Sequence, residues 1–198
     1  MGSSGNSETW AVGDRDTVID ALDRAVARHP DKILLDFSGE LYTYAQVDSL
    51  STKMANALST LGVKAGETVL TMLDNNIDAV TTWLAINKLC AVSVPINTAL
   101  KGEFLRHQIA DTGTSVVICE AAYLPRITPL AGQLQDVHHI LHRGTLEAAP
   151  ECPIRIAPLD EWRGHDTTPL ANKPQPAAAT SLIYTSGTTG PSKGCMIS

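Results

Sequence analysis

Three short apolar runs decide the fold of this chain: TVLTML at residues 68–73, AVSVPI at residues 91–96 and SVVIC at residues 115–119. Each run is nearly continuous in apolar residues, which is typical of strands that are buried on both faces of a parallel sheet. Amphipathic segments at 77–89 and 102–110 separate the runs, and such strand–helix alternation favours an α/β fold with right-handed crossovers. We therefore expect a largely parallel sheet flanked by helices, with these three strands as parallel neighbours.

Three further elements are predicted before residue 68. A periodic apolar stripe predicts a helix over residues 17–28, with Asp16 as its N-cap. A turn between two short apolar runs predicts a hairpin of strands 33–37 and 41–44, and a second apolar stripe predicts a helix over 45–61 that stops at Gly62.

The alternation continues after residue 119 and then changes character. A helix around 121–134 and a strand over 137–141 are expected first. Six of the eleven prolines lie in 143–180, which predicts an irregular connection with one short strand near 154–156. We accordingly divide the chain into a flexible N-terminal tail (1–15), an α/β sheet subdomain (16–142), a proline-rich connection (143–180) and a strand with the loop that follows it (181–198).

The composition is that of a soluble globular protein. The 198 residues are 43% hydrophobic and 18% charged, so intrinsic disorder is excluded. The net charge of −6 disfavours nucleic acid or an anionic membrane surface as the main partner. The longest apolar segment, residues 77–96, is too polar to span a membrane. The four cysteines form no CxxC pair, which favours reduced packing residues in a cytoplasmic protein.

Three neighbouring histidines, His138, His139 and His142, raise the question of a metal site. They lie at the end of a predicted strand. We interpret them as structural or solvated residues and expect no metal site in this chain.

The segment YTSGTTGPSKG at residues 184–194 has the residue types of a ligand-binding loop. Its glycines allow tight turns that bring backbone N–H groups close to a ligand, its hydroxyl groups can donate to phosphate oxygens, and Lys193 adds a positive charge. These features predict a phosphate-binding loop directly after strand 181–184. The segment is neither a Walker A loop nor a dinucleotide fingerprint. From composition alone, a flexible linker is the alternative.

The order of residues in this loop resembles the phosphate-binding signature of the adenylate-forming superfamily, whose usual form is YTSGTTGxPKG. The chain departs from that form only at Pro191 and Ser192, which leaves Lys193 in register. Two earlier segments, LYTYAQV at 41–47 and NKLCAVSVPIN at 87–97, also resemble family segments. Within them we interpret Tyr44 and Asn97 as core or loop anchors, and Cys90 stands where the family usually has glycine.

The resemblance implies the large N-terminal domain of an acyl-CoA synthetase-like fold and a reaction in two steps. A carboxylic acid attacks the α-phosphate of ATP and forms an acyl-adenylate with release of pyrophosphate. A thiol, usually that of coenzyme A, then displaces AMP. ATP, Mg²⁺ and coenzyme A are the implied cofactors, and no catalytic residue is assigned to this chain. The implied phosphate-binding residues are Thr185, Ser186, Gly187, Thr188, Thr189, Gly190 and Lys193.

Several alternatives stay open at this stage. Family members continue well beyond the position of Ser198, so we expect an N-terminal fragment that is inactive alone and that lacks the adenine pocket, the acidic residue on the ribose, most of the acyl pocket and the small C-terminal domain with its catalytic lysine. A peptide-synthetase adenylation domain is one alternative, although SGTTG and the PINT of residues 95–98 look closer to acyl-CoA synthetases. A non-catalytic α/β module is another. The identity of the acid and homo-oligomerisation are both undecided.

Overall fold

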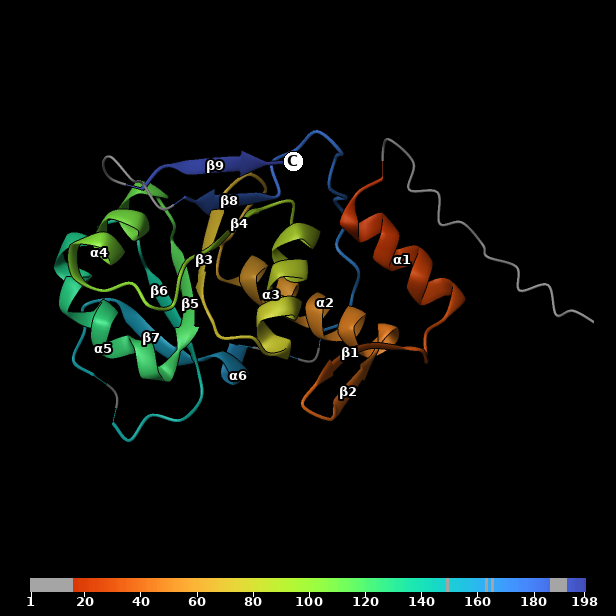
Figure 1. Ribbon diagram of the computed structural model, residues 1–198, viewed down its shortest axis with the longest axis horizontal. Coiled ribbons are helices and arrows are strands. Elements are labelled where there is room, and N and C mark those ends of the chain that lie inside the picture. The colour runs from red at the N-terminus through yellow and green to blue at the C-terminus, as the bar shows by residue number, and fades with distance from the viewer. Residues whose placement is uncertain (1–15, 149, 163, 165, 186–191) are drawn as a thin grey trace, which may run out of the picture.

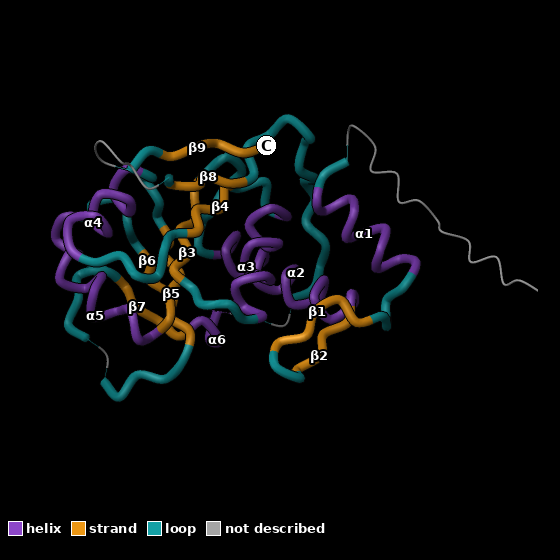
Figure 2. The backbone as a smooth tube through the Cα atoms, in the orientation of Figure 1, coloured by secondary structure: helices purple, strands orange, loops and turns teal. Residues whose placement is uncertain are grey.

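The computed structural model describes residues 16–148, 150–162, 164, 166–185 and 192–198. Seven strands form one sheet in the order β7-β6-β5-β3-β4-β8-β9, and helices cover both of its faces (Figures 1 and 2). The strands are β3 (Thr68–Met72), β4 (Val92–Pro95), β5 (Val116–Glu120), β6 (His139–Arg143), β7 (Arg155–Pro158), β8 (Ser181–Tyr184) and β9 (Gly194–Ile197).

The predicted α/β class is confirmed. Strand β3 pairs in parallel with β4 on one side and with β5 on the other, as the three apolar runs predict. Strands β6, β7 and β8 extend the parallel pairing, and within the described part of this sheet only the β8–β9 pair is antiparallel. Every residue of β5 is buried, because side chains pack against both faces of the strand.

Four longer helices and a small hairpin complete the frame. The hairpin forms a separate two-stranded sheet beside α1 and α2 (Figure 1). These elements are α1 (Val18–Arg28), β1 (Ile33–Phe37), β2 (Glu40–Thr43), α2 (Tyr44–Thr60), α3 (Ile77–Lys88) and α4 (Gly102–Asp111).

The core has a layer on each face of the sheet. Helices α2 and α3 lie on one face, where Leu58 and Ile86 pack with Val69 of β3 (Figure 1). Helix α4 and the short turns after β5 lie on the other face, where Leu105 packs with Leu70 of β3. Adjacent residues of β3 thus point to opposite layers, as the pleat of a strand requires. No helix within the described residues is both long and apolar enough to cross a membrane.

The prediction of one helix around 121–134 is wrong. The segment is divided into a 3₁₀ turn (Ala121–Tyr123), the short helix α5 (Leu124–Ile127) and a second 3₁₀ turn (Thr128–Gln133). Pro125 and Pro129 lie in this segment, and proline has no N–H for the hydrogen bond of a continuous helix. The next strand is β6, two residues later than predicted.

The proline-rich connection is more regular than predicted. Strand β7 lies in it and pairs in parallel with β6, with Ile156 opposite Ile140. The short helix α6 (Leu159–Trp162) follows directly. Trp162 then packs edge-on against the ring of His139, with ring centroids 6.1 Å apart. Strands β7, β8 and β9 therefore belong to the same sheet as the central strands.

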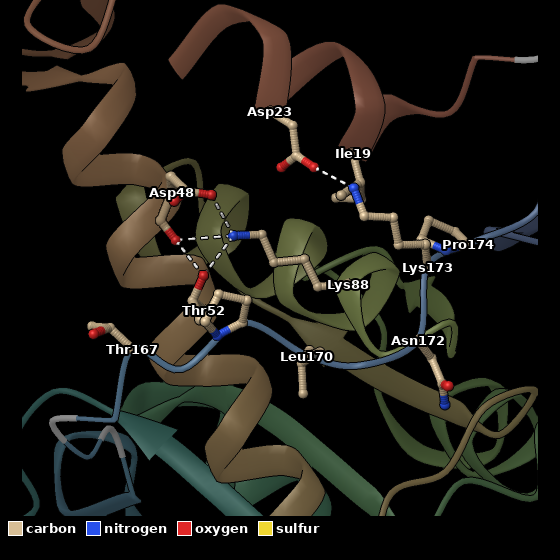
Figure 3. A pocket seen from close by; sticks show the side chains of 11 residues that line it. Ile19, Asp23, Asp48, Thr52, Lys88, Thr167, Leu170, Asn172, Lys173 and Pro174 are labelled. Carbon is tan, nitrogen blue, oxygen red and sulfur yellow. Dashed lines mark hydrogen bonds and ion pairs between the residues drawn. The ribbon is translucent and has the colours of Figure 1, made fainter. Parts of the chain in front are cut away.

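After α6 the chain crosses back over α2 and α1 (Figure 3). The side-chain amide of Asn56 donates to the carbonyl groups of Asp166 and Thr168, at 3.0 Å each. Further on, the ammonium group of Lys173 pairs with Asp23 on α1 at 3.0 Å. These contacts tie the connection to the outer helices before it reaches β8.

The helix N-termini show which polar residue caps which helix. Thr17, not Asp16, caps α1: its hydroxyl oxygen accepts from the backbone N–H of Asp20, whose carboxylate accepts from the N–H of Thr17. This reciprocal capping box satisfies two N–H groups at once, and Asp16 instead pairs with Arg24 at 2.8 Å. At α3 the N-cap is Asn76, whose side-chain oxygen accepts from the backbone N–H of Ala79 at 3.0 Å.

The C-termini of α2 and α3 share one geometry with different residues. At the end of α3, Ala91 N–H donates to Ile86 O and Cys90 N–H donates to Asn87 O, which is a Schellman motif. Cys90 has a φ of 59° there, while α2 ends in the same way at Gly62 with a φ of 93°. The left-handed backbone is the physical reason for a glycine at the family position that Cys90 occupies.

Candidate functional site

The candidate loop connects the two strands of the β8–β9 hairpin. Strand β8 is parallel to β4, with Ser181 opposite Ser93, so the loop begins at the carboxyl ends of the parallel strands. In open α/β sheets this edge is where ligands bind. The antiparallel return of β9, with Gly194 opposite Tyr184, brings the chain straight back along β8. The strand that leads into the predicted loop therefore ends at the edge where ligands bind in open α/β sheets.

The two described ends of the loop face each other. The backbone N–H of Thr185 donates to the carbonyl oxygen of Lys193 at 3.1 Å, and the Thr185 hydroxyl lies 3.4 Å from the same oxygen. Both residues are exposed. Within the described ranges the Lys193 ammonium forms no ion pair, so its charge is available to an anion. The other predicted phosphate-binding residues, at 186–190, lie outside the residues that the structure describes.

The last glycine of the motif has a packing role. A Cβ atom at Gly194 would lie 2.7 Å from Cδ1 of Leu182 on the neighbouring strand. The glycine therefore lets the side chain of Leu182 cover the start of β9. Its place in the motif is explained by the hairpin and requires no contact with a ligand.

Helix α4 contacts the hairpin on both sides of the loop. The hydroxyl of Tyr184 donates to the Asp111 carboxylate at 2.6 Å. One turn earlier on the helix, Nε2 of His107 lies 3.4 Å from the carbonyl oxygen of Ser192. Burial, followed by the hydrogen bond to Asp111, raises the pKa of Tyr184. His107 and Asp111 were not predicted from the sequence. Their partners, Ser192 and Tyr184, lie 85 and 73 positions later, and no local pattern links residues so far apart.

A network of charged side chains joins the carboxyl ends of β3, β5 and β6. Arg143 donates to Asp78 at 2.7 Å and to Glu120 at 3.3 Å. The other oxygen of Glu120 accepts from the side chain of Asn76 at 2.8 Å and from the backbone N–H of Asp74 at 3.2 Å. Asp78 and Glu120 are each only 7% exposed. Since these buried carboxylates are paired within the network, we interpret it as structural support for the sheet edge.

A cavity of about 260 Å³ lies away from the hairpin, between α1, α2, α3 and residues 167–174 (Figure 3). The ammonium group of Lys88 reaches into the space between the helices. It donates to Asp48 O at 3.0 Å, to Asp48 Oδ1 at 2.7 Å and to Thr52 Oγ1 at 2.7 Å. All three ammonium hydrogens are therefore used. Lys88 joins α2 to α3 and has no donor left for a ligand.

The histidines and cysteines of the described residues form no cluster of potential metal ligands, and the cysteines differ in burial. No group of three or more potential metal-binding side chains occurs among the described residues. The four cysteines are free. Cys119 is buried in β5, and burial raises the pKa of its thiol to about 12. Cys195 is exposed on β9, so its interpretation as a packing residue is wrong for this chain.

The two anchor residues behave as interpreted. Tyr44 begins α2 and packs with Leu84 of α3 in the cluster beside α1. The Asn97 side chain accepts from the backbone N–H of Ala99 at 2.8 Å, which holds the turn after β4. Both side chains thus make contacts within the scaffold.

Comparison with known proteins gives consistent matches. A family model described as AMP-binding enzyme matches residues 22–198. The chain is 31% identical over 180 residues to 4-coumarate–CoA ligase 5 of Oryza sativa subsp. japonica, covering 89% of this chain and 31% of that protein. It is 31% identical over 176 residues to syringomycin synthase SyrB1 of Pseudomonas syringae pv. syringae, covering 89% and 25%.

Solved structures agree with the sequence matches. The anthranilate CoA ligase AuaEII, in complex with anthranoyl-AMP, superimposes with a TM-score of 0.83 at 31% identity. The match covers 92% of this chain and 34% of that one. The chain thus spans about a third or less of the length of these proteins.

Proposed function

The chain belongs to the family of AMP-binding enzymes, and on that premise we propose that it takes part in the ATP-dependent activation of a carboxylic acid. A carboxylate oxygen attacks the α-phosphorus of ATP, the bond to the β-phosphate breaks, and pyrophosphate leaves. The acyl-adenylate then reacts with the thiol of coenzyme A. A C–S bond forms, the thiol proton is released, and AMP leaves with the electrons of the broken C–O bond.

The observation that supports this proposal is the order YTSGTTGPSKG in the hairpin connection at the carboxyl end of β8. The two ends of that connection, Thr185 and Lys193, are joined by a backbone hydrogen bond of 3.1 Å. We propose that residues 185–190 and Lys193 bind the β- and γ-phosphates of MgATP. Donors fixed around the leaving group stabilise the charge that develops in the transition state, which is a large term in enzymatic rate enhancement.

The proposal extends to the thiol acceptor. The PINT of residues 95–98 and the SGTTG of residues 186–190 favour the acyl-CoA synthetase branch of the family. A carrier-bound thiol, as in peptide-synthetase adenylation domains, is the second candidate, and the similarity to SyrB1 supports it. Acyl transfer to coenzyme A and to a pantetheinylated carrier protein, measured side by side, distinguishes the two. Aromatic acids are the first substrates to try, because two of the proteins compared above are named for 4-coumarate and anthranilate.

The test of the loop is ATP–pyrophosphate exchange by the complete polypeptide that contains this chain, across fatty, aryl and amino acids. Replacement of Lys193 by alanine removes a cation from the leaving pyrophosphate, so we expect exchange to slow by about 10²–10³-fold. Lys64→Ala is the matched control, because Lys64 is exposed near the opposite, amino-terminal edge of the sheet. An unchanged rate in Lys193→Ala contradicts the assigned role.

The 198-residue chain alone provides a second assay. Catalysis of this kind depends on groups that converge from distant segments, and the chain spans about a third of the length of the relatives. We expect no exchange activity with any acid in the panel. Clear turnover by the chain alone would show that the segments outside it are less necessary than the proposal holds.

A further inference from the structure

Helix α4 presents two polar side chains to the phosphate-loop hairpin from one of its faces. His107 and Asp111 are four residues apart, so their side chains lie on the same side of the helix. Asp111 accepts from the Tyr184 hydroxyl at 2.6 Å, and His107 lies 3.4 Å from Ser192 O. The two contacts are with the residues directly before Thr185 and directly before Lys193. The helix therefore contacts the end of the strand that enters the loop and the segment just before the strand that leaves it.

The helix itself is fixed on the sheet. Its opposite face carries Leu105 and Ile109, which are both buried in the core cluster that includes Leu70 and Val94. Interiors of this kind are packed as closely as organic crystals, so a helix seated in one has little freedom to shift. The contacts with the hairpin pass this rigidity to the two ends of the loop.

The contact between Tyr184 and Asp111 is the stronger of the two. A hydroxyl that donates to an ionised carboxylate over 2.6 Å forms a short, charge-assisted hydrogen bond. Burial and this hydrogen bond raise the pKa of the Tyr184 phenol. A phenol is protonated at neutral pH even at its ordinary pKa, so Tyr184 is a donor in this contact. His107 adds a longer contact that also depends on a proton at Nε2.

We propose that Asp111 is a positioning residue for the phosphate-binding loop, acting through Tyr184, with His107 in support. The inference rests on the proposed function, because it assigns the contact to the part of the site that receives the phosphates of ATP. A loop whose ends are held before the nucleotide arrives loses less entropy on binding it. Loss of the contact weakens the use of ATP and leaves recognition of the acid unchanged.

The experiment measures ATP–pyrophosphate exchange in the complete polypeptide with varied ATP and varied acid. We expect Asp111→Ala and Tyr184→Phe to raise the KM for ATP about tenfold, the factor that about 1.4 kcal/mol provides. The KM for the acid should stay within twofold, roughly the scatter between independent sites. Asp111→Asn keeps an acceptor oxygen for the phenol and should restore most of the lost affinity.

Tyr123→Phe is the matched control. The Tyr123 hydroxyl also donates to a carboxylate, that of Asp74, at the same distance of 2.6 Å. That bond joins the turn after β5 to the segment after β3 and involves no residue of the hairpin. A rise in the KM for ATP in this variant equal to that in Tyr184→Phe would overturn the inference, because general loosening would then explain both.

Hydrogen–deuterium exchange gives a readout that needs no activity. The Thr185 amide, which is bonded to Lys193 O in the wild-type chain, should exchange several-fold faster in Asp111→Ala and in Tyr184→Phe, since loss of the contact favours local opening. Amides of β3 should not change. An unchanged hydrogen-exchange rate of the Thr185 amide in both variants overturns the inference. If the wild-type polypeptide shows no ATP–pyrophosphate exchange with any acid, that result counts against the proposed function. The hydrogen-exchange rate of the Thr185 amide then decides the inference on its own.

Discussion

The central strands and the β8–β9 hairpin are built from similar apolar residues and have opposite surroundings. In β3, Leu70 is fully buried between helices and neighbouring strands. In the hairpin, Ile183 is 41% exposed and Met196 is 62% exposed. The difference comes from the number of neighbours: a central strand has strands on both sides and helices on both faces, while β9 pairs only with β8 among the strands that the structure describes. The comparison teaches that stability is concentrated in the centre, and the candidate chemistry lies on the lightly packed edge.

The reactivity of two thiols provides the largest expected contrast between these regions. Cys119 lies in the central strand β5, and burial raises the pKa of its thiol to about 12. Cys195 lies exposed on the hairpin. The thiolate is the reactive form, so a shift from about 9 to about 12 alone lowers the reactive fraction of Cys119 by about 10³.

Mass-spectrometric mapping of alkylated peptides over time measures this contrast at neutral pH. We expect Cys195 to be modified in the native chain and Cys119 only after unfolding in denaturant. Addition of denaturant should bring the two rates together. Equal rates under native conditions would show that β5 opens as readily as the hairpin, which would remove the distinction between the two regions.

Truncation of one side chain in each region gives the next largest effect. Leu70→Ala leaves a cavity in the core, and such changes cost about 2–5 kcal/mol of unfolding free energy. Met196→Ala removes a side chain that is mostly in water, so its cost should stay within about 0.5 kcal/mol. Urea unfolding followed by circular dichroism checks both variants. A cost for Met196→Ala close to that for Leu70→Ala would mean that another surface covers β9.

The central region is also where the sequence is most informative. A buried parallel strand requires consecutive apolar residues, so β3, β4 and β5 are visible in residues 68–73, 91–96 and 115–119. The pairing of β7 with β6 could not be predicted in this way, because the sequence of neither segment specifies the other as its partner. Pro125 and Pro129 divide the segment after β5, because proline outweighs apolar periodicity wherever a helix needs the missing N–H.

The candidate site was partly predictable for a related reason. The order of residues in 184–194 is local and identifies the loop, and the structure brings its ends, Thr185 and Lys193, together. The support from His107 and Asp111 was not predictable, because it depends on how α4 crosses the sheet. Long-range contacts of this kind arise only when the layers pack.

The smallest predicted effect concerns Cys90, which ends α3 in a left-handed conformation with a φ of 59°. A residue with a Cβ atom is strained there by about 1–2 kcal/mol. Glycine removes that strain but adds about 0.5–1 kcal/mol of unfolded-state entropy. Cys90→Gly should therefore stabilise the chain by roughly 0.5 kcal/mol, the difference between these terms. The gain should appear as a higher denaturation midpoint with an unchanged urea dependence.

Two controls make this small effect interpretable. Gly62→Ala at the equivalent end of α2 meets no atom within 4 Å, so the same balance of backbone strain and unfolded-state entropy should destabilise it by roughly 0.5 kcal/mol. Cys152→Gly makes the same chemical change at a position without a positive φ and should give no stabilisation. If Cys90→Gly loses stability as Cys152→Gly does, packing of the half-buried thiol outweighs backbone strain. The central region would then depend on side-chain contacts even at a helix end, which would sharpen its contrast with the exposed hairpin.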